Sequence, residues 1–186
     1  MREGKQGLPA GGAAKRIGEI NLLPRDAFVA AFGGVFEHSP WVAEAAWERR
    51  PWQSRSDLHA TMSAVVREAG AERQIDLIRA HPDLVGRAAL AGTLTRSSTA
   101  EQIAAGLDPG RLSAQEIRRF ADANAAYQER FGFPFVVCAR ENTRDAILAG
   151  FSRRLRNTAE DEVATALAEI EKIAWYRLVD LIPDET

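Results

Sequence analysis

Three polar side chains lie where the surrounding sequence is apolar, and the first of them is a histidine. His81 follows Ile78 by three residues, which places it on the apolar face of a predicted helix. Because Pro82 disfavours the helical conformation in the residue before it, His81 must lie where that helix ends. An imidazole titrates near neutral pH and can act as an acid or a base. His81 can equally be a core histidine whose two ring nitrogens are bonded by backbone groups.

The other two are an acid and a guanidinium. Glu101 stands three residues after Ser98, a spacing typical of a capping box, in which both side chains only close a helix start. A helix start also presents unpaired amides to an anion, so capping and binding are compatible. Arg177 follows Ile173 by four residues, on the face of the last predicted helix that points to the core. It is an internal ion pair, a side chain that extends to solvent, or a clamp for a substrate carboxylate or ureido oxygen.

Arg154 could also face the core, although its sequence context supports this less strongly than that of Arg177. It follows Phe151 by three residues, but its neighbours Arg153 and Arg156 favour a charged surface run. We therefore expect Arg154 at the surface.

Several common kinds of site are not predicted. The three histidines lie far apart and the single cysteine, Cys138, has no partner, so we expect no metal site. The chain has no GxxxxGK[ST] or GxGxxG loop for a nucleotide and no GxSxG nucleophile motif. One histidine, one glutamate and one core-facing arginine without a cofactor favour proton transfer on a small polar molecule.

Composition narrows the class of protein. The 186 residues are 46% hydrophobic and 27% charged, enough for one compact domain, and the formal net charge is -2. That balance argues against nucleic acid as a partner, since phosphate binding needs uncompensated Lys and Arg. We expect no membrane span, because no stretch approaches the roughly 20 apolar residues that one needs. A lone cysteine fits a reducing compartment, and we expect a cytoplasmic protein.

The elements that position these residues are predicted to be helices, because apolar residues recur at spacings of three and four. We expect helices over residues 27–36, 42–49, 57–69, 72–80, 114–130, 143–156 and 159–181. The apolar run 133–138 lacks helical spacing and predicts a short buried extended segment. The predicted fold is all-α, a single-domain bundle of about eight helices. Residues 1–19 are expected to form a disordered leader and residues 20–186 the single helical domain.

Segments along most of this chain also resemble, in order, those of one family, the 2-oxo-4-hydroxy-4-carboxy-5-ureidoimidazoline (OHCU) decarboxylases of urate breakdown. Seven ordered segments are far more specific than any one of them. They are Phe36-Glu37-His38-Ser39-Pro40-Trp41, Arg50-Pro51-Trp52, Ala80-His81-Pro82-Asp83-Leu84, Leu94-Thr95, residues 98–102 with Ala105-Gly106-Leu107, Phe131-Gly132-Phe133-Pro134-Phe135-Val136, and Arg177-Leu178.

The resemblance implies an all-helical fold, no cofactor and a homodimer, with a ureidoimidazoline as the small-molecule substrate. It implies that His81 is the catalytic acid/base and that Glu101 assists it, by orienting the imidazole or holding its charge. Arg177 would meet a substrate oxygen. The remaining substrate-binding residues that it implies are Pro82, Ser98 and Gln102, with the backbone of Phe135, Val136, Val137, Cys138 and Ala139.

The implied reaction agrees with this inventory. Loss of carbon dioxide from the hydroxyl-bearing ring carbon sends electrons to the adjacent imine, so the substrate carries its own electron sink. A proton must then reach the ureido-bearing carbon from one face, which yields S-allantoin. Two alternatives stay open: a helical protein-interaction module in which His81 and Arg177 are core and interface residues, and a lyase or hydrolase for another ureido compound.

Overall fold

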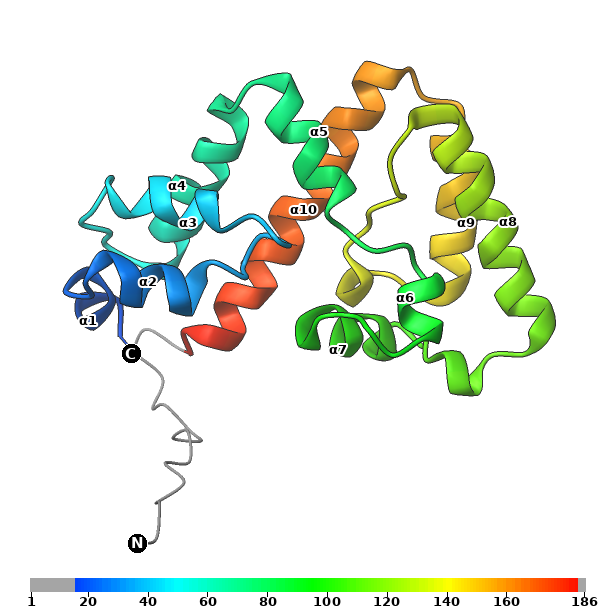
Figure 1. Ribbon diagram of the computed structural model, residues 1–186, viewed down its shortest axis with the longest axis horizontal. Coiled ribbons are helices and arrows are strands. Elements are labelled where there is room, and N and C mark those ends of the chain that lie inside the picture. Colours follow the sequence, from blue (N-terminus) through cyan, green and yellow to red (C-terminus); the bar gives the residue numbers. More distant parts are fainter. Residues whose placement is uncertain (1–15, 184–186) are drawn as a thin grey trace, which may run out of the picture.

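The fold is all-helical, as predicted. The computed structural model describes residues 16–183, and within this range the chain forms ten α-helices, two 3-10 helices and no strand (Figure 1). The α-helices are α1 (Ile17–Asn21), α2 (Arg25–Phe32), α3 (Pro40–Trp47), α4 (Arg55–Glu68), α5 (Ala71–Arg79), α6 (Arg87–Leu90), α7 (Arg96–Ala104), α8 (Ala114–Phe131), α9 (Arg144–Arg154) and α10 (Ala159–Leu181). The 3-10 helices are η1 (Pro109–Arg111) and η2 (Ala139–Glu141).

The longest helix, α10, runs through the middle of the molecule. Figure 1 shows α1 to α4 on one side of it and α6, α8 and α9 on the other. It packs against both α4 and α5. Its inward face carries the small and branched residues that let other helices approach, among them Ala166, Ile170, Ala174 and Leu178. A side chain on this face therefore lies between the two sides of the fold.

The predicted helix starts agree with the structure where a capping residue is present. Ser54 begins α4 by accepting a hydrogen bond from the Asp57 amide at 3.0 Å. Ser113 and Glu116 form a complete capping box at the start of α8. Gly132 ends α8 in the left-handed conformation, with φ 74°, and the chain then turns into the extended segment.

Other boundaries differ from the prediction for local reasons. The first helix expected over 27–36 ends at Phe32, because two glycines follow it. The next begins at Pro40, which suits the first helical position. Of the expected leader, residues 1–15 lie outside the described range, whereas Ile17 to Glu19 belong to α1.

The buried extended segment is confirmed. Residues 133–138 are neither helix nor strand, and Phe133, Phe135, Val136 and Cys138 among them are buried in the main hydrophobic core. In the part of the chain that the structure covers, no helix is both long and apolar enough to cross a membrane.

Candidate active site

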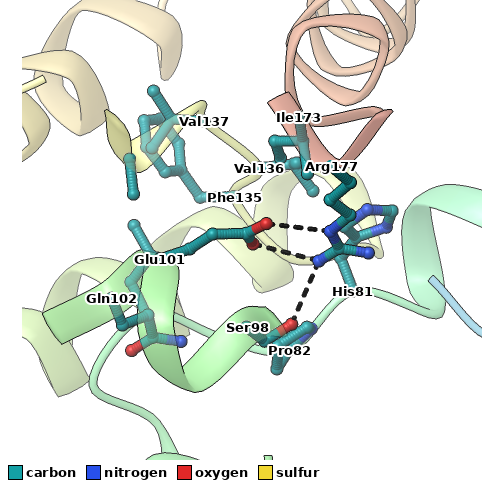
Figure 2. Close-up of a pocket in the computed structure, with 12 residues that line it drawn as sticks. His81, Pro82, Ser98, Glu101, Gln102, Phe135, Val136, Val137, Ile173 and Arg177 are labelled. Atoms are coloured by element: carbon teal, nitrogen blue, oxygen red, sulfur yellow. Dashed lines mark hydrogen bonds and ion pairs between the residues drawn. The ribbon is translucent and has the colours of Figure 1, made fainter. Parts of the chain in front are cut away.

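Ten of the eleven residues predicted for the site line one cavity. It lies between the loop after α5, helix α7, the extended segment and α10 (Figure 2). Leu84 and Ile173, which were not predicted, complete the lining. The predicted lining residues are His81, Pro82, Ser98, Glu101, Gln102, Phe135, Val136, Val137, Ala139 and Arg177. The cavity therefore combines one titratable ring and one ion pair with an apolar wall.

His81 is placed by the end of α5. The helix stops at Arg79, and the His81 side chain is buried, with 7% of its surface exposed. Its Nδ1 lies 2.9 Å from the Leu77 carbonyl oxygen. Because a carbonyl only accepts, Nδ1 carries the proton and donates it. The other ring nitrogen, Nε2, is buried and has no hydrogen-bond partner among the described residues.

This environment keeps the imidazole neutral. Burial lowers the pKa of His81 to about 4, although the hydrogen bond to Leu77 acts in the opposite direction. The nearby Arg177 lowers the pKa further, and the Glu37 carboxylate raises it. At neutral pH, His81 therefore presents an unshared electron pair at Nε2 and can accept a proton.

Arg177 is the centre of a buried ion-pair network. Its Nε and Nη2 donate to the two carboxylate oxygens of Glu101 at 2.8 and 3.0 Å. Its Nη1 donates to the backbone carbonyls of Gly34 and Val35 at 3.3 and 3.4 Å. Burial lowers the pKa of Arg177, but the hydrogen bonds and charge of Glu101 outweigh it and leave the pKa above its usual value. The predicted core-facing guanidinium is therefore held in place by the protein's own acceptors.

Glu37 is the residue that sequence reasoning missed. It is 2% exposed, and its Oε2 lies 2.7 Å from Arg177 Nη2. The hydroxyl groups of Thr95 and Ser98 donate to its two oxygens at 2.9 and 3.0 Å. Burial raises the pKa of Glu37, but the charge and hydrogen bonds of Arg177 outweigh this and leave it lowered. Two carboxylates, Glu37 and Glu101, thus share one guanidinium, and the network carries a net negative charge.

The start of α7 differs from the capping box that Ser98 and Glu101 suggested. The capping residue is Thr95, whose hydroxyl oxygen accepts from the Ser98 amide at 3.2 Å. Ser98 and Glu101 therefore lie within the helix, and both are buried. This frees the Glu101 carboxylate to bind Arg177.

Gln102 fixes the loop that follows His81. Its amide oxygen accepts from the Val85 amide at 3.0 Å, and its amide nitrogen donates to the Asp83 carbonyl at 3.4 Å. Val85 has a positive φ of 52°, an unusual conformation for a branched residue. Asn124 on α8 donates to the Leu84 carbonyl at 2.9 Å. These side-chain amides hold the cavity wall around Pro82 and Leu84 in one shape.

Cys138 is the predicted residue that does not line this cavity. Its amide donates to Glu169 at 2.8 Å, and its carbonyl accepts from Asn142 at 2.9 Å. Burial raises the pKa of its thiol to about 11. Both backbone groups of Cys138 are therefore bonded within the protein, and its thiol is not a nucleophile at neutral pH.

Arg154 is buried, so the prediction that it lies at the surface was wrong. Only 4% of it is exposed, and its Nε donates to Glu162 Oε1 at 2.7 Å. The neighbours that suggested a surface run do face solvent, but Arg154 points inward with Phe151 and Ile147.

Taken together, the site can bind a small polar molecule and move a proton. Among residues 16–183, no three His, Cys, Asp or Glu side chains gather in a way that could hold a metal ion. The groups available for chemistry are the bare Nε2 of His81, the Glu101 carboxylate and the Arg177 guanidinium.

Comparison with known proteins finds matches along most of the chain. The sequence profile of the family described as OHCU decarboxylase matches residues 21–179. An OHCU decarboxylase of Haloferax volcanii is 42% identical over 167 residues, which are 90% of this chain and 96% of that protein. The uric acid degradation bifunctional protein PucL of Bacillus subtilis is 38% identical over 90% of this chain and 33% of its own length. The crystal structure of an (S)-allantoin synthase superposes with a TM-score of 0.72 and 30% identity, over 90% of this chain and 54% of that one.

Proposed function

The chain belongs to the OHCU decarboxylase family, and on that premise we propose that His81 is the general acid/base of its reaction. The protein is a carboxy-lyase that converts OHCU to allantoin in urate degradation. The observation that carries the proposal is that His81 lines the cavity with its buried Nε2 unpartnered among the described residues, while its Nδ1 is held by Leu77.

The proposed mechanism uses His81 twice. When the carboxylate leaves as carbon dioxide, its bonding electrons form a double bond to the ureido-bearing carbon, and the imine nitrogen of the ring takes up the displaced pair. The substrate hydroxyl gives its proton to His81 Nε2 as the enol becomes a carbonyl. The imidazolium then delivers that proton to the ureido-bearing carbon. One histidine thus moves one proton between two substrate atoms and returns to its neutral form. The ring nitrogen that took up the electron pair gains a second proton from solvent, which balances the charge of the departed carboxylate and gives neutral allantoin.

Delivery of the proton from one side determines the configuration of the product. Because the Leu77 hydrogen bond fixes the ring, Nε2 can reach only one face of a bound intermediate. We propose that the product is S-allantoin. The spontaneous reaction has no chiral proton donor, so an excess of the S enantiomer can come only from the catalysed route.

Glu101 and Arg177 are proposed to bind the substrate by exchanging partners. All the N–H groups of Arg177 already point at acceptors, so it can meet a substrate oxygen only by releasing one of them. We expect it to release Glu101, because the substrate carboxylate carries the same charge and shape. The freed Glu101 carboxylate can then accept N–H groups of the ureido chain. The orientation of His81 comes from Leu77 and does not depend on Glu101.

The remaining predicted residues are proposed to shape the pocket. The cavity is small, with a volume of about 30 Å³. Pro82 and Phe135 to Val137 supply apolar surface, which favours neutral carbon dioxide over the carboxylate. Gln102 is proposed to hold the loop and to face the substrate.

The test is the His81→Asn variant. Asparagine can still donate a hydrogen bond but cannot take up a proton, so kcat should fall by about 10² to 10⁴. The matched control is His59→Asn, because the His59 ring bonds the Glu171 carbonyl away from the cavity. Thermal unfolding and allantoin binding should be retained in both. A His81→Asn protein that turns over OHCU as fast as the His59→Asn control would refute the role of His81.

Three wider expectations stay predictions. The homodimer implied by the family resemblance can be measured by light scattering of the purified protein. Substitution of the exposed Leu90 and Ile103, each in turn, tests whether these side chains belong to the contact surface. Cytoplasmic localisation and the lack of a nucleic-acid partner can be checked by fractionation.

A further inference from the structure

The backbone of the extended segment 133–138 depends on side chains from other elements for its hydrogen bonds. It forms one wall of the cavity through Phe135, Val136 and Val137, yet it has no helical or sheet hydrogen bonds of its own. Buried backbone groups need partners, so side chains from elsewhere must hold this segment. Glu169 and Asn142 do so at Cys138. At Val136, next to the cavity, the partner is Arg154.

Arg154 makes two contacts with this wall. Its Nη1 donates to the Val136 carbonyl at 2.6 Å. The guanidinium carbon lies 4.4 Å from the centre of the Phe135 ring, within the range of a cation–π contact. The Phe135 ring also stacks on Phe151, with ring centres 3.9 Å apart. The ring that faces the cavity therefore has Arg154 and Phe151 as its support.

The guanidinium is itself held by a fully buried acid. Glu162 is 0% exposed and accepts from Arg154 Nε at 2.7 Å and from Asn157 Nδ2 at 2.7 Å. The buried Tyr127 hydroxyl also donates to Glu162, and it accepts from Arg154 Nη2 at 3.3 Å. Three elements, α8, α9 and α10, thus meet at this pair.

A role in stability alone explains this arrangement poorly. Taking two charges out of water offsets most of their mutual attraction, and apolar residues of similar volume often stabilise as well or better. Only a guanidinium can hold a carboxylate along one edge, donate to a carbonyl from another and lie over a ring. Those last two contacts both end on the wall of the cavity.

We propose that Arg154, fixed by Glu162, is a positioning residue that sets the shape of the Phe135–Val136 wall and thereby the affinity for substrate. The inference rests on the proposed function of the cavity. It predicts that loss of the Val136 and Phe135 contacts raises KM and the dissociation constant of allantoin while kcat is retained, because His81 and Glu101 are untouched.

The experiment compares Arg154→Lys and Arg154→Met with the neighbouring exposed Arg153→Met. Lysine keeps the charge beside Glu162 but cannot make all three contacts at once, so KM should rise about tenfold, the equivalent of one charged hydrogen bond. Arg154→Met should raise it further, and Arg153→Met should leave it unchanged. Should the Arg154 variants not fold, Tyr127→Phe loosens the same pair by removing one hydroxyl.

A readout independent of catalysis separates this inference from the proposed function. Amide hydrogen exchange of residues 135–139 should become faster in Arg154→Lys than in Arg153→Met, whatever the wild-type protein does to OHCU. An inactive wild-type protein would refute the function alone. Unchanged exchange and unchanged KM in folded Arg154→Lys, or in Tyr127→Phe if it replaces that variant, would overturn the positioning role.

Discussion

Lowering the pH is expected to leave the activity intact well below the range in which an ordinary histidine titrates. Burial lowers the pKa of His81 from 6.5 to about 4, against the opposing effect of the Leu77 hydrogen bond. At about 1.4 kcal/mol for each pH unit, the fold favours the neutral ring by about 3 kcal/mol. A base with a pKa of about 4 is about 97% neutral at pH 5.5, whereas a base with the ordinary value is about 9% neutral.

The assay follows from these fractions. OHCU is prepared beforehand and mixed rapidly with the protein in buffers from pH 4 to 8, and the spontaneous rate is subtracted. We expect kcat/KM at pH 5.5 to stay within about 10% of its value at pH 8, whereas an ordinary histidine would give about an elevenfold loss. Nitrogen NMR of labelled histidine, with His81→Asn to assign the signal, measures the same pKa without substrate.

The direction in which pH changes the free energy of unfolding can be measured on the same samples. Because the pKa of His81 is lower in the folded protein than in the unfolded chain, the unfolded chain binds the extra proton between about pH 6.5 and 4. This contribution to the free energy of unfolding is fully present above pH 6.5 and is lost as the pH falls toward 4. A kcat/KM profile and an NMR signal that both titrate near 6.5 would refute the argument from burial.

Three further predictions concern other parts of the structure. Glu37→Gln removes one of the two carboxylates paired with Arg177 and should lower the free energy of unfolding by about 2 kcal/mol in denaturant titration. The same substitution should lower the pKa of His81, because the Glu37 carboxylate raises it; an unchanged pKa would contradict the network. Gly132→Ala should lower the free energy of unfolding by about 1 kcal/mol because its φ is 74°, and a variant as stable as the wild type would contradict this. Cys138, buried and with its pKa raised to about 11, should react with a thiol reagent only after unfolding, which absorbance of the released dye would show.

Local sequence signals were sufficient for the residues whose position depends on a helix. Ser54 and Ser113 cap α4 and α8, two helices that the spacing of apolar residues predicts, and Pro82 ends α5 so that His81 turns inward. Arg177 lies on the buried face of α10 because its apolar neighbours set that face. In each case the cause lies within a few residues along the chain.

Residues whose role depends on distant partners could not be predicted in this way. Glu37 lies between two helices, and nothing near it in the sequence points to Arg177. The neighbouring arginines predict that Arg154 is exposed to solvent, but its partner Glu162 lies on the next helix, α10, and holds it inside. The one available signal was that Arg154 shares a helical spacing with Phe151. Such pairs depend on tertiary packing, which periodicity does not describe.

The central claim is that His81 delivers a proton to one face of the substrate inside the cavity, and the configuration of the product tests it most directly. OHCU is generated from urate with urate oxidase and 5-hydroxyisourate hydrolase, the protein is added, and circular dichroism follows the allantoin formed. We expect rapid appearance of the S enantiomer with the wild-type protein and slow racemic product with folded His81→Asn. Racemic allantoin from the wild-type protein, or S-allantoin formed at the wild-type rate by His81→Asn, would contradict it.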